Sequence, residues 1–177
     1  MGSIRQGRHC ATIAAWVTQI ARTHASAGLV YELVDLKDWP LPMDDEPGIP
    51  AQDAYDQPHT QAWSEKIKSA DGFVFVTPQY NWGYPAVLKN ALDHVYKEWH
   101  DKPAVIVSYG GHGGSKCAAQ LAQVLKGLGM RPVPTQPQIT LTRFMIGGGP
   151  IDTDIDFSSY SDTVAQAFAD LQAALLT

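Results

Sequence analysis

Cysteine and long apolar runs are both scarce in this chain of 177 residues. The two cysteines, Cys10 and Cys117, lie far apart and form no CxxC pair, so we expect two reduced thiols, with one disulfide as the alternative. No run of roughly 18 apolar residues occurs, which argues against a membrane span. The first ten residues lack the apolar core of a secretion signal. Together these absences predict a cytoplasmic protein.

Positively charged residues are also fewer than negatively charged ones. The chain has 13 lysines and arginines against 18 aspartates and glutamates, a net charge of −5. Nucleic acids and anionic membranes require a basic face, so we expect neither as a partner. The length and the 45% share of hydrophobic residues fit a single domain over residues 1–177 with a substantial core.

Several catalytic and cofactor motifs are missing. No Gly-x-Ser-x-Gly is present, which argues against a hydrolase elbow. Gly111-His112-Gly113 precedes another glycine, but residues 130–139 carry no acid, so a dinucleotide fingerprint is not predicted there.

Metal ligands are also sparse. Asp93, His94, Glu98 and His100 are the best candidates, and His94 and Glu98 are interpreted as a solvated pair one helical turn apart. We therefore expect no metal site.

What the chain does contain is an alternation of strand-like and helix-like segments, which predicts a parallel sheet covered by helices. A proline-rich stretch over residues 37–60 predicts a long surface loop. Pro85 is expected as a first helical residue and Ser115 as an N-cap. The expected strands are 29–36, 73–77, 103–109 and an edge strand within 130–141; the expected helices are 10–24, 60–70, 85–95, 115–128 and 160–175.

Three loops rich in small residues should meet at the carboxyl edge of that sheet, where open α/β sheets bind ligands. Residues 2–9 offer a hydroxyl and two guanidiniums before a helix, which suits a phosphate, or they form a solvated basic tail. Residues 78–84 offer aromatic rings suited to a flat heterocycle, or a plain turn. Residues 108–114 offer glycines that permit close backbone approach, or a simple strand-to-helix turn.

These stretches resemble the NADPH-dependent FMN reductases, a family with a flavodoxin-like fold that also includes quinone and azo-dye reductases. The segment Gly2-Ser-Ile-Arg-Gln-Gly-Arg8 resembles the family's phosphate loop. The segment Pro78-Gln-Tyr-Asn-Trp-Gly-Tyr-Pro-Ala-Val-Leu-Lys-Asn-Ala-Leu-Asp93 resembles its most specific motif, with Gln79 where glutamate is usual. The stretch from Lys102-Pro103 to Gly114 resembles its third loop, so the likeness covers residues 2–130.

The resemblance implies a flavodoxin-like α/β sandwich, a parallel sheet of order 2-1-3-4-5, bound FMN, and NADPH or NADH as co-substrate. A hydride would pass from the nicotinamide to flavin N5, and electrons would then pass to a flavin, quinone or similar acceptor, with no catalytic side chain required. Members are commonly homodimers or dimers of dimers. By position, Ser3, Arg5 and Arg8 would bind the phosphate; Pro78, Gln79, Tyr80 and Asn81 would line the ribityl chain and ring; and Ser108, Tyr109, Gly110 and Gly111 would cover the ring's other edge.

Two alternatives stay open: a flavodoxin-type electron carrier, and a truncated, flavin-free binding protein. The second is motivated by a missing piece, because the chain begins inside the phosphate loop and the first strand of the 2-1-3-4-5 order has no counterpart. We expect an apolar run of about six residues to precede Gly2 in the natural polypeptide. Without it, the neighbouring strands should either leave a gap or close up.

Overall fold

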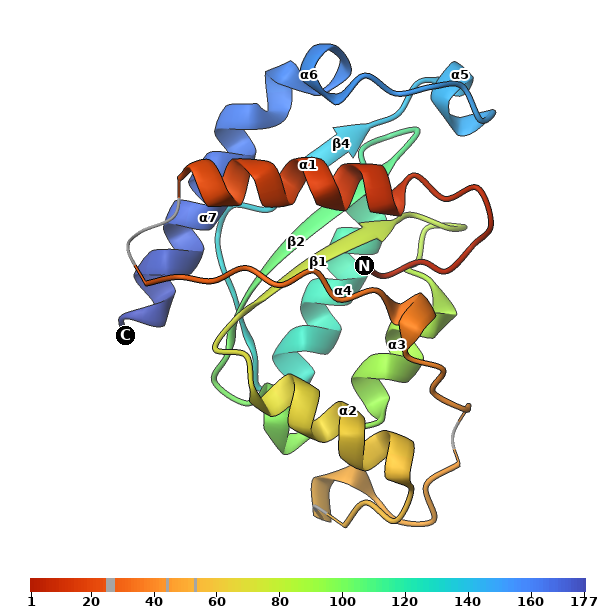
Figure 1. Ribbon diagram of the computed structural model, residues 1–177, viewed down its shortest axis with the longest axis vertical. Helices are drawn as coiled ribbons and strands as arrows, with labels where there is room; N and C mark the ends of the chain where they lie inside the picture. The colour runs from red at the N-terminus through yellow and green to blue at the C-terminus, as the bar shows by residue number, and fades with distance from the viewer. Residues whose placement is uncertain (25–27, 44, 53) are drawn as a thin grey trace.

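Figure 1 shows a parallel sheet with helices on both faces, in a computed structural model that describes residues 1–177 except 25–27, 44 and 53. The helices are α1 (Cys10–Thr23), α2 (Pro58–Lys68), α3 (Ala86–Asp93), α4 (Ser115–Gly127), α5 (Arg143–Ile146), α6 (Thr153–Asp156) and α7 (Ser161–Leu175). The strands are β1 (Phe73–Pro78), β2 (Pro103–Gly110), β3 (Arg131–Pro132) and β4 (Gln138–Thr140), and short 3₁₀ turns lie at Leu36–Asp38, Pro50–Gln52, Lys97–Trp99 and Ser158–Tyr160.

Strand β2 shows why the sheet has two covered faces. Val105 and Val107 belong to the core cluster formed with α1 and α7, whereas Ala104 and Ile106 belong to the cluster formed with α2, α3 and α4. Successive side chains of a strand point to opposite faces, so an unbroken apolar run is buried on both sides. This confirms the predicted helix-covered parallel sheet.

The ladder runs from β1 to β2 and on to β3 and β4, all parallel. Pro134 and Pro137 interrupt the last strand, as the proline content of residues 130–141 predicts for a sheet edge. The side-chain oxygen of Gln136 replaces part of the lost ladder by accepting a hydrogen bond from the Ile106 N–H. The full 2-1-3-4-5 order stays a prediction.

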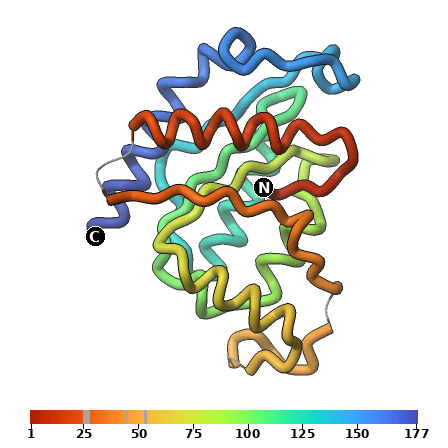
Figure 2. The backbone as a smooth tube through the Cα atoms, in the orientation of Figure 1, coloured from red at the N-terminus to blue at the C-terminus, as the bar shows by residue number. Residues whose placement is uncertain are grey.

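The expectation of a strand over residues 29–36 is wrong. In the described part of the chain this stretch forms no ladder, although it runs alongside β1 (Figure 2). Met1 and Gly2, at the start of the chain, link this stretch to the sheet. The Met1 amino group donates to the Val34 oxygen at 2.6 Å, and the Gly2 N–H donates to the Val76 oxygen at 2.9 Å.

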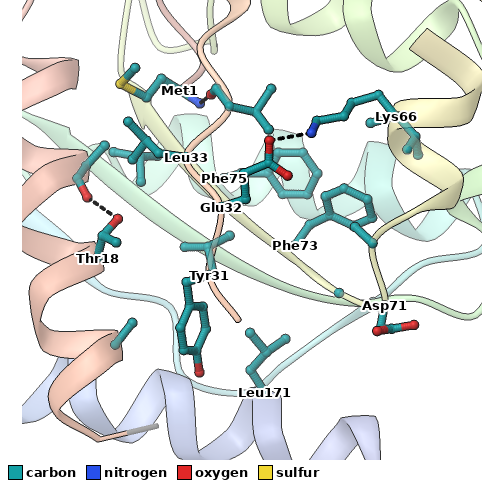
Figure 3. Close-up of a pocket in the computed structure, with 18 of the residues that line it drawn as sticks. Met1, Thr18, Tyr31, Glu32, Leu33, Lys66, Asp71, Phe73, Phe75 and Leu171 are labelled. Atoms are coloured by element: carbon teal, nitrogen blue, oxygen red, sulfur yellow. Dashed lines mark hydrogen bonds and ion pairs between the residues drawn. The ribbon is translucent and has the colours of Figure 1, made fainter. Parts of the chain in front are cut away.

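A cavity of about 540 Å³ lies between this stretch and β1. Figure 3 shows Met1, Leu33 and Tyr31 among the lining residues, with Tyr31 directed toward Leu171 of α7, whereas Phe73 and Phe75 belong to the cluster on the other face. A strand is defined by hydrogen bonds to its neighbours, and here the space where a neighbour would lie is empty. Of the two predicted outcomes, the structure therefore shows the gap.

Two helix starts differ from expectation by one residue. Pro85 is the residue before α3, and Gly114, with φ of 80°, precedes α4, so Ser115 is the first helical residue and not the cap. A β-carbon on Gly114 would lie 2.9 Å from the β-carbon of Ser108, so a larger residue would not fit there. In the part of the chain that the structure describes, no helix is both long and apolar enough to cross a membrane.

Candidate functional site

The loops at residues 2–9 and 78–84 meet through Ser3 and Tyr80. The Ser3 hydroxyl lies 2.9 Å from the Tyr80 hydroxyl. The Arg5 guanidinium lies over the Tyr80 ring, 3.7 Å from its centroid. The backbone N–H of Arg5 donates a hydrogen bond to Ser3 Oγ at 3.4 Å. A hydroxyl, a cation and an aromatic ring from two distant segments therefore share one place at the carboxyl edge of the sheet.

Helix α1 begins directly behind this contact. His9 precedes it without a side-chain cap, so the N–H groups of the first turn are left to other partners. Gly7 has φ of 69°, which lets the loop turn sharply before the helix. The His9 ring is hydrogen-bonded elsewhere, because its Nε2 lies 2.6 Å from the Met145 carbonyl oxygen. Such a helix start, beside Arg5 and the Ser3 hydroxyl, has the donors that a phosphate monoester requires.

Arg8 is placed differently from Arg5. Its guanidinium forms a two-point contact with the Asp35 carboxylate and also donates to the Ser3 carbonyl. Burial acts to raise the pKa of Asp35, but the Lys37 N–H and the Arg8 guanidinium outweigh it and hold that pKa below its ordinary value. Arg8 thus joins the loop at residues 2–9 to Asp35. The spacing of these residues in the sequence did not predict this contact.

The loop at 78–84 is a tight hairpin. The Tyr80 and Gly83 backbones exchange hydrogen bonds of 2.8 and 2.9 Å, and Asn81 and Trp82 between them have φ of 49° and 72°. Two left-handed residues define a type I′ turn, which usually takes Asn-Gly. Trp82 is therefore strained, and it is 65% exposed with the Lys116 ammonium 4.4 Å from its ring.

Gln79 joins this hairpin to the third loop. Its N–H donates to the Tyr109 carbonyl at 2.8 Å, and its side-chain oxygen accepts from the Cys117 N–H at 3.1 Å, at the start of α4. A β-carbon added to Gly110 would lie 3.4 Å from the β-carbon of Gln79. The three predicted loops are thereby linked in one continuous chain of contacts, from Ser3 through Tyr80 and Gln79 to Tyr109.

The third loop buries Ser108 and Tyr109 and presents its glycine backbone and His112 to solvent. Ser108 is fully buried and donates to the Gly113 carbonyl at 2.8 Å, which closes the loop on itself. Tyr109 is 3% exposed and lies in the core, where burial raises the pKa of its phenol. Gly110 is partly exposed, and Gly111 and His112 are exposed, with the Ile146 side chain 3.5 Å from where a Gly111 β-carbon would lie.

The two cysteines are free and buried, as expected for reduced thiols. Burial raises the pKa of the Cys117 thiol to about 11, so this sulfur stays protonated at neutral pH. Both sulfurs are buried, so neither cysteine is a candidate nucleophile.

The interpretation of His94 and Glu98 as a solvated pair is wrong, because both are buried. Helix α3 ends at Asp93 and a 3₁₀ turn follows, so the two residues do not share one helix face. The Glu98 carboxylate accepts hydrogen bonds from the Tyr55 hydroxyl at 2.9 Å and the Ser64 hydroxyl at 2.5 Å.

Fold and loops together define an open α/β protein whose three loops form a candidate site at the carboxyl ends of its parallel strands, with chemistry suited to a phosphorylated, planar molecule. The family model described as "NADPH-dependent FMN reductase" matches residues 1–142. The chain belongs to the NADPH-dependent FMN reductase family.

Relatives across the whole length support this assignment. The chain is 54% identical over 172 residues to an NAD(P)H-dependent FMN reductase of Schizosaccharomyces pombe, covering 96% of this chain and 85% of that protein. It is 43% identical to an NAD(P)H-dependent FMN reductase of Saccharomyces cerevisiae, covering 96% and 92%. Among solved structures it is similar to FerB, a flavoenzyme NAD(P)H:(acceptor) oxidoreductase of Paracoccus denitrificans, with a TM-score of 0.72 at 21% identity, covering 98% and 94%. The last likeness shows the fold, which is flavodoxin-like.

Proposed function

We propose that this protein is an NAD(P)H-dependent oxidoreductase that uses FMN to reduce a small acceptor such as a flavin or a quinone, and that residues 1–177 form one FMN-binding domain. The observation that carries the proposal is the linked set of loops from Ser3 through Tyr80 and Gln79 to Tyr109. The family assignment supports it. Bound FMN would supply the redox chemistry, as acceptor of a hydride and donor of electrons.

The protein's own residues would bind and orient the flavin. Ser3, Arg5 and the N–H groups at the start of α1 have the donor chemistry of a phosphate site. Pro78, Gln79, Tyr80 and Asn81 would line the ribityl chain and ring, and the open backbone at Gly110 and Gly111 would border the ring's other edge. Arg8, Ser108 and Tyr109 are engaged by protein atoms, so we assign them to holding the loops in place.

A spectral experiment tests the proposal. Purified protein is titrated with FMN and, under exclusion of oxygen, with NADPH and then NADH. A flavin band that saturates near one FMN per chain and bleaches with either nicotinamide supports the oxidoreductase. A band that bleaches only with an added reductase protein supports the flavodoxin-type carrier. A preparation that takes up no FMN supports the flavin-free binding protein.

The phosphate assignment is tested separately with Arg5→Gln and with Arg22→Gln as a matched control, since Arg22 is an exposed arginine in the last turn of α1. We expect Arg5→Gln to weaken FMN binding about 10- to 100-fold, the range of a charge-assisted hydrogen bond. Binding of riboflavin, which has no phosphate, should change little. An equal loss for FMN and riboflavin would contradict the assignment.

The acidic charge of −5 supports a further part of the proposal, the absence of nucleic-acid partners. The two free, buried cysteines fit a reducing compartment and support the proposed cytoplasmic location. We also propose a homodimer. Ile4, Trp82, Phe144 and Ile146 are each about half exposed or more and belong to the site loops or lie close to them. A shared apolar surface beside the flavin would shield them. Light scattering of the eluting protein tests this, and a monomer of 19.3 kDa would rule it out.

A further inference from the structure

Three metal-ligating side chains from separate parts of the chain meet away from the flavin loops. Asp45 lies in the proline-rich loop, His59 in the first turn of α2, and His94 at the end of α3. Their ligand atoms all lie within 4.8 Å of one another. The Asp45 Oδ1 accepts a hydrogen bond from His59 Nε2 at 3.0 Å and lies 3.9 Å from His94 Nε2, so an ion bound here would displace the hydrogen of His59 Nε2.

His94 is the informative member of this cluster. Its side chain is 4% exposed, and its Nδ1 lies 2.8 Å from the Asn90 carbonyl, which can only accept, so Nδ1 carries the hydrogen. The neutral ring then directs a lone pair from Nε2. That buried nitrogen has no hydrogen-bond partner among the described residues. A buried, unpaired acceptor is costly unless something binds it.

The arrangement of the His94 ring is the one that metal-bound histidines adopt. One ring nitrogen donates to a backbone carbonyl, which fixes the ring's orientation, and the other is free to ligate. His59 and Asp45 are partly exposed, at 29% and 31% of their side chains, so an ion can reach the cluster from solvent. A cavity of about 500 Å³ lined by Asp45 and His94 provides the path.

The charged groups next to the cluster have hydrogen-bond or ion-pair partners of their own. The Glu46 carboxylate is occupied by the N–H groups of Asp56 and Gln57, at 2.9 and 3.0 Å. The Lys89 ammonium, which also lines the cavity, is paired with Asp93 on its own helix. With Lys89 offset by Asp93, the carboxylates of Asp45 and Glu46 leave the cavity wall negatively charged, which favours a cation.

We propose that Asp45, His59 and His94 bind one divalent transition-metal ion of the Zn²⁺ type. Bonds of about 2.0–2.2 Å place tetrahedral ligand atoms roughly 3.4 Å apart. The 3.0 and 3.9 Å separations from Asp45 lie within about 0.5 Å of that value, and the two histidine nitrogens, which lie within 4.8 Å of each other, close toward it by a rotation of the partly exposed His59 ring. Water from the cavity completes the four-coordinate shell. Because the three ligands come from a loop and two helices, the ion ties the proline-rich loop to α2 and α3.

The test uses the FMN-loaded protein with any affinity tag removed. The protein is dialysed against Zn²⁺ and then against buffer, and the retained metal is measured by elemental analysis. We expect about one Zn²⁺ per chain. At a Zn²⁺ concentration of about 100 times the dissociation constant, we expect a rise in the thermal midpoint of roughly 5–10 °C.

The variants are His59→Ala and Asp45→Asn, chosen because both residues are partly exposed, with His24→Ala as the control at an exposed histidine. We expect His59→Ala and Asp45→Asn to weaken Zn²⁺ binding at least about 10-fold while FMN content stays unchanged. His24→Ala should bind like the wild type. If the wild type retains no Zn²⁺, or if all four proteins retain it equally, the proposal is overturned.

Discussion

At the residue scale, the contact between Arg8 and Asp35 determines how the first loop is anchored. Both side chains are about 13–14% exposed, and the guanidinium meets the carboxylate at two points. Nothing in the spacing of residues 8 and 35 predicts it, because a salt bridge between distant segments exists only after folding. Of the two arginines expected at the phosphate, the structure engages Arg8 with a carboxylate and leaves Arg5 beside Tyr80.

We expect Asp35→Asn to lower the free energy of unfolding by about 1–3 kcal/mol at pH 7, because Arg8 loses a partly buried partner. The pKa of Asp35 is depressed in the folded state, so its stabilisation is present above the ordinary carboxyl pKa of about 3.9 and is lost as the pH falls through the folded pKa. Urea unfolding of both proteins from pH 7 downward measures this.

Asp93→Asn serves as the control, because Asp93 forms a half-exposed pair with Lys89 on one helix. Its effect should stay within about 0.5 kcal/mol. A gap between Asp35→Asn and wild type that widens toward acid pH would contradict the assigned role of Asp35.

At the scale of elements, the hairpin at Tyr80–Gly83 holds Trp82 in a conformation that tryptophan rarely adopts. We expect Trp82→Gly to raise the free energy of unfolding by about 1 kcal/mol relative to Trp82→Ala, since both remove the ring and its contact with Lys116 but only glycine relieves the positive φ. Thermal and urea unfolding of the two variants make the comparison. Equal stabilities would mean that the turn is not strained.

Most elements could be predicted because their signals are local. The apolar runs of β1 and β2 and the helical stripes of α1, α2 and α7 give both type and approximate bounds, and the apolar stripe of α2 buries Trp63 and Ile67. Pro85 and Ser115 were misplaced by one position, because a cap and a first helical residue differ by a single hydrogen bond. The prediction of a strand over residues 29–36 was wrong for another reason, since a strand also requires a neighbouring strand to pair with.

At the scale of the whole molecule, the cavity of about 540 Å³ beside β1 has apolar walls and backbone acceptors that a further strand could pair with. Gly2 already donates to the Val76 carbonyl, and continuing that parallel ladder backward would bring donors to Val74 and Gly72. On the other side, Met1 already pairs with Val34. Apolar side chains from α1 and α7 close one face of the space, and those from α2 and α3 close the other.

We therefore expect a stabilising effect from six alternating valines and isoleucines added directly before Met1. Filling the cavity and pairing both edges should raise the thermal midpoint by at least about 4 °C. An extension of six glycines and serines of the same length is the control and should change the midpoint little. Equal midpoints for the two extensions would show that the cavity does not accept a strand.

The sequence by itself determined the covered parallel sheet, the three small-residue loops at one edge and the family likeness, because these depend on periodicity and on contiguous motifs. Only the tertiary structure decided that Arg8 meets Asp35, that Ser108 and Tyr109 turn inward, and that Asp45, His59 and His94 share one place. These features join residues distant in the chain, and their distances are set by how the sheet, helices and loops pack together.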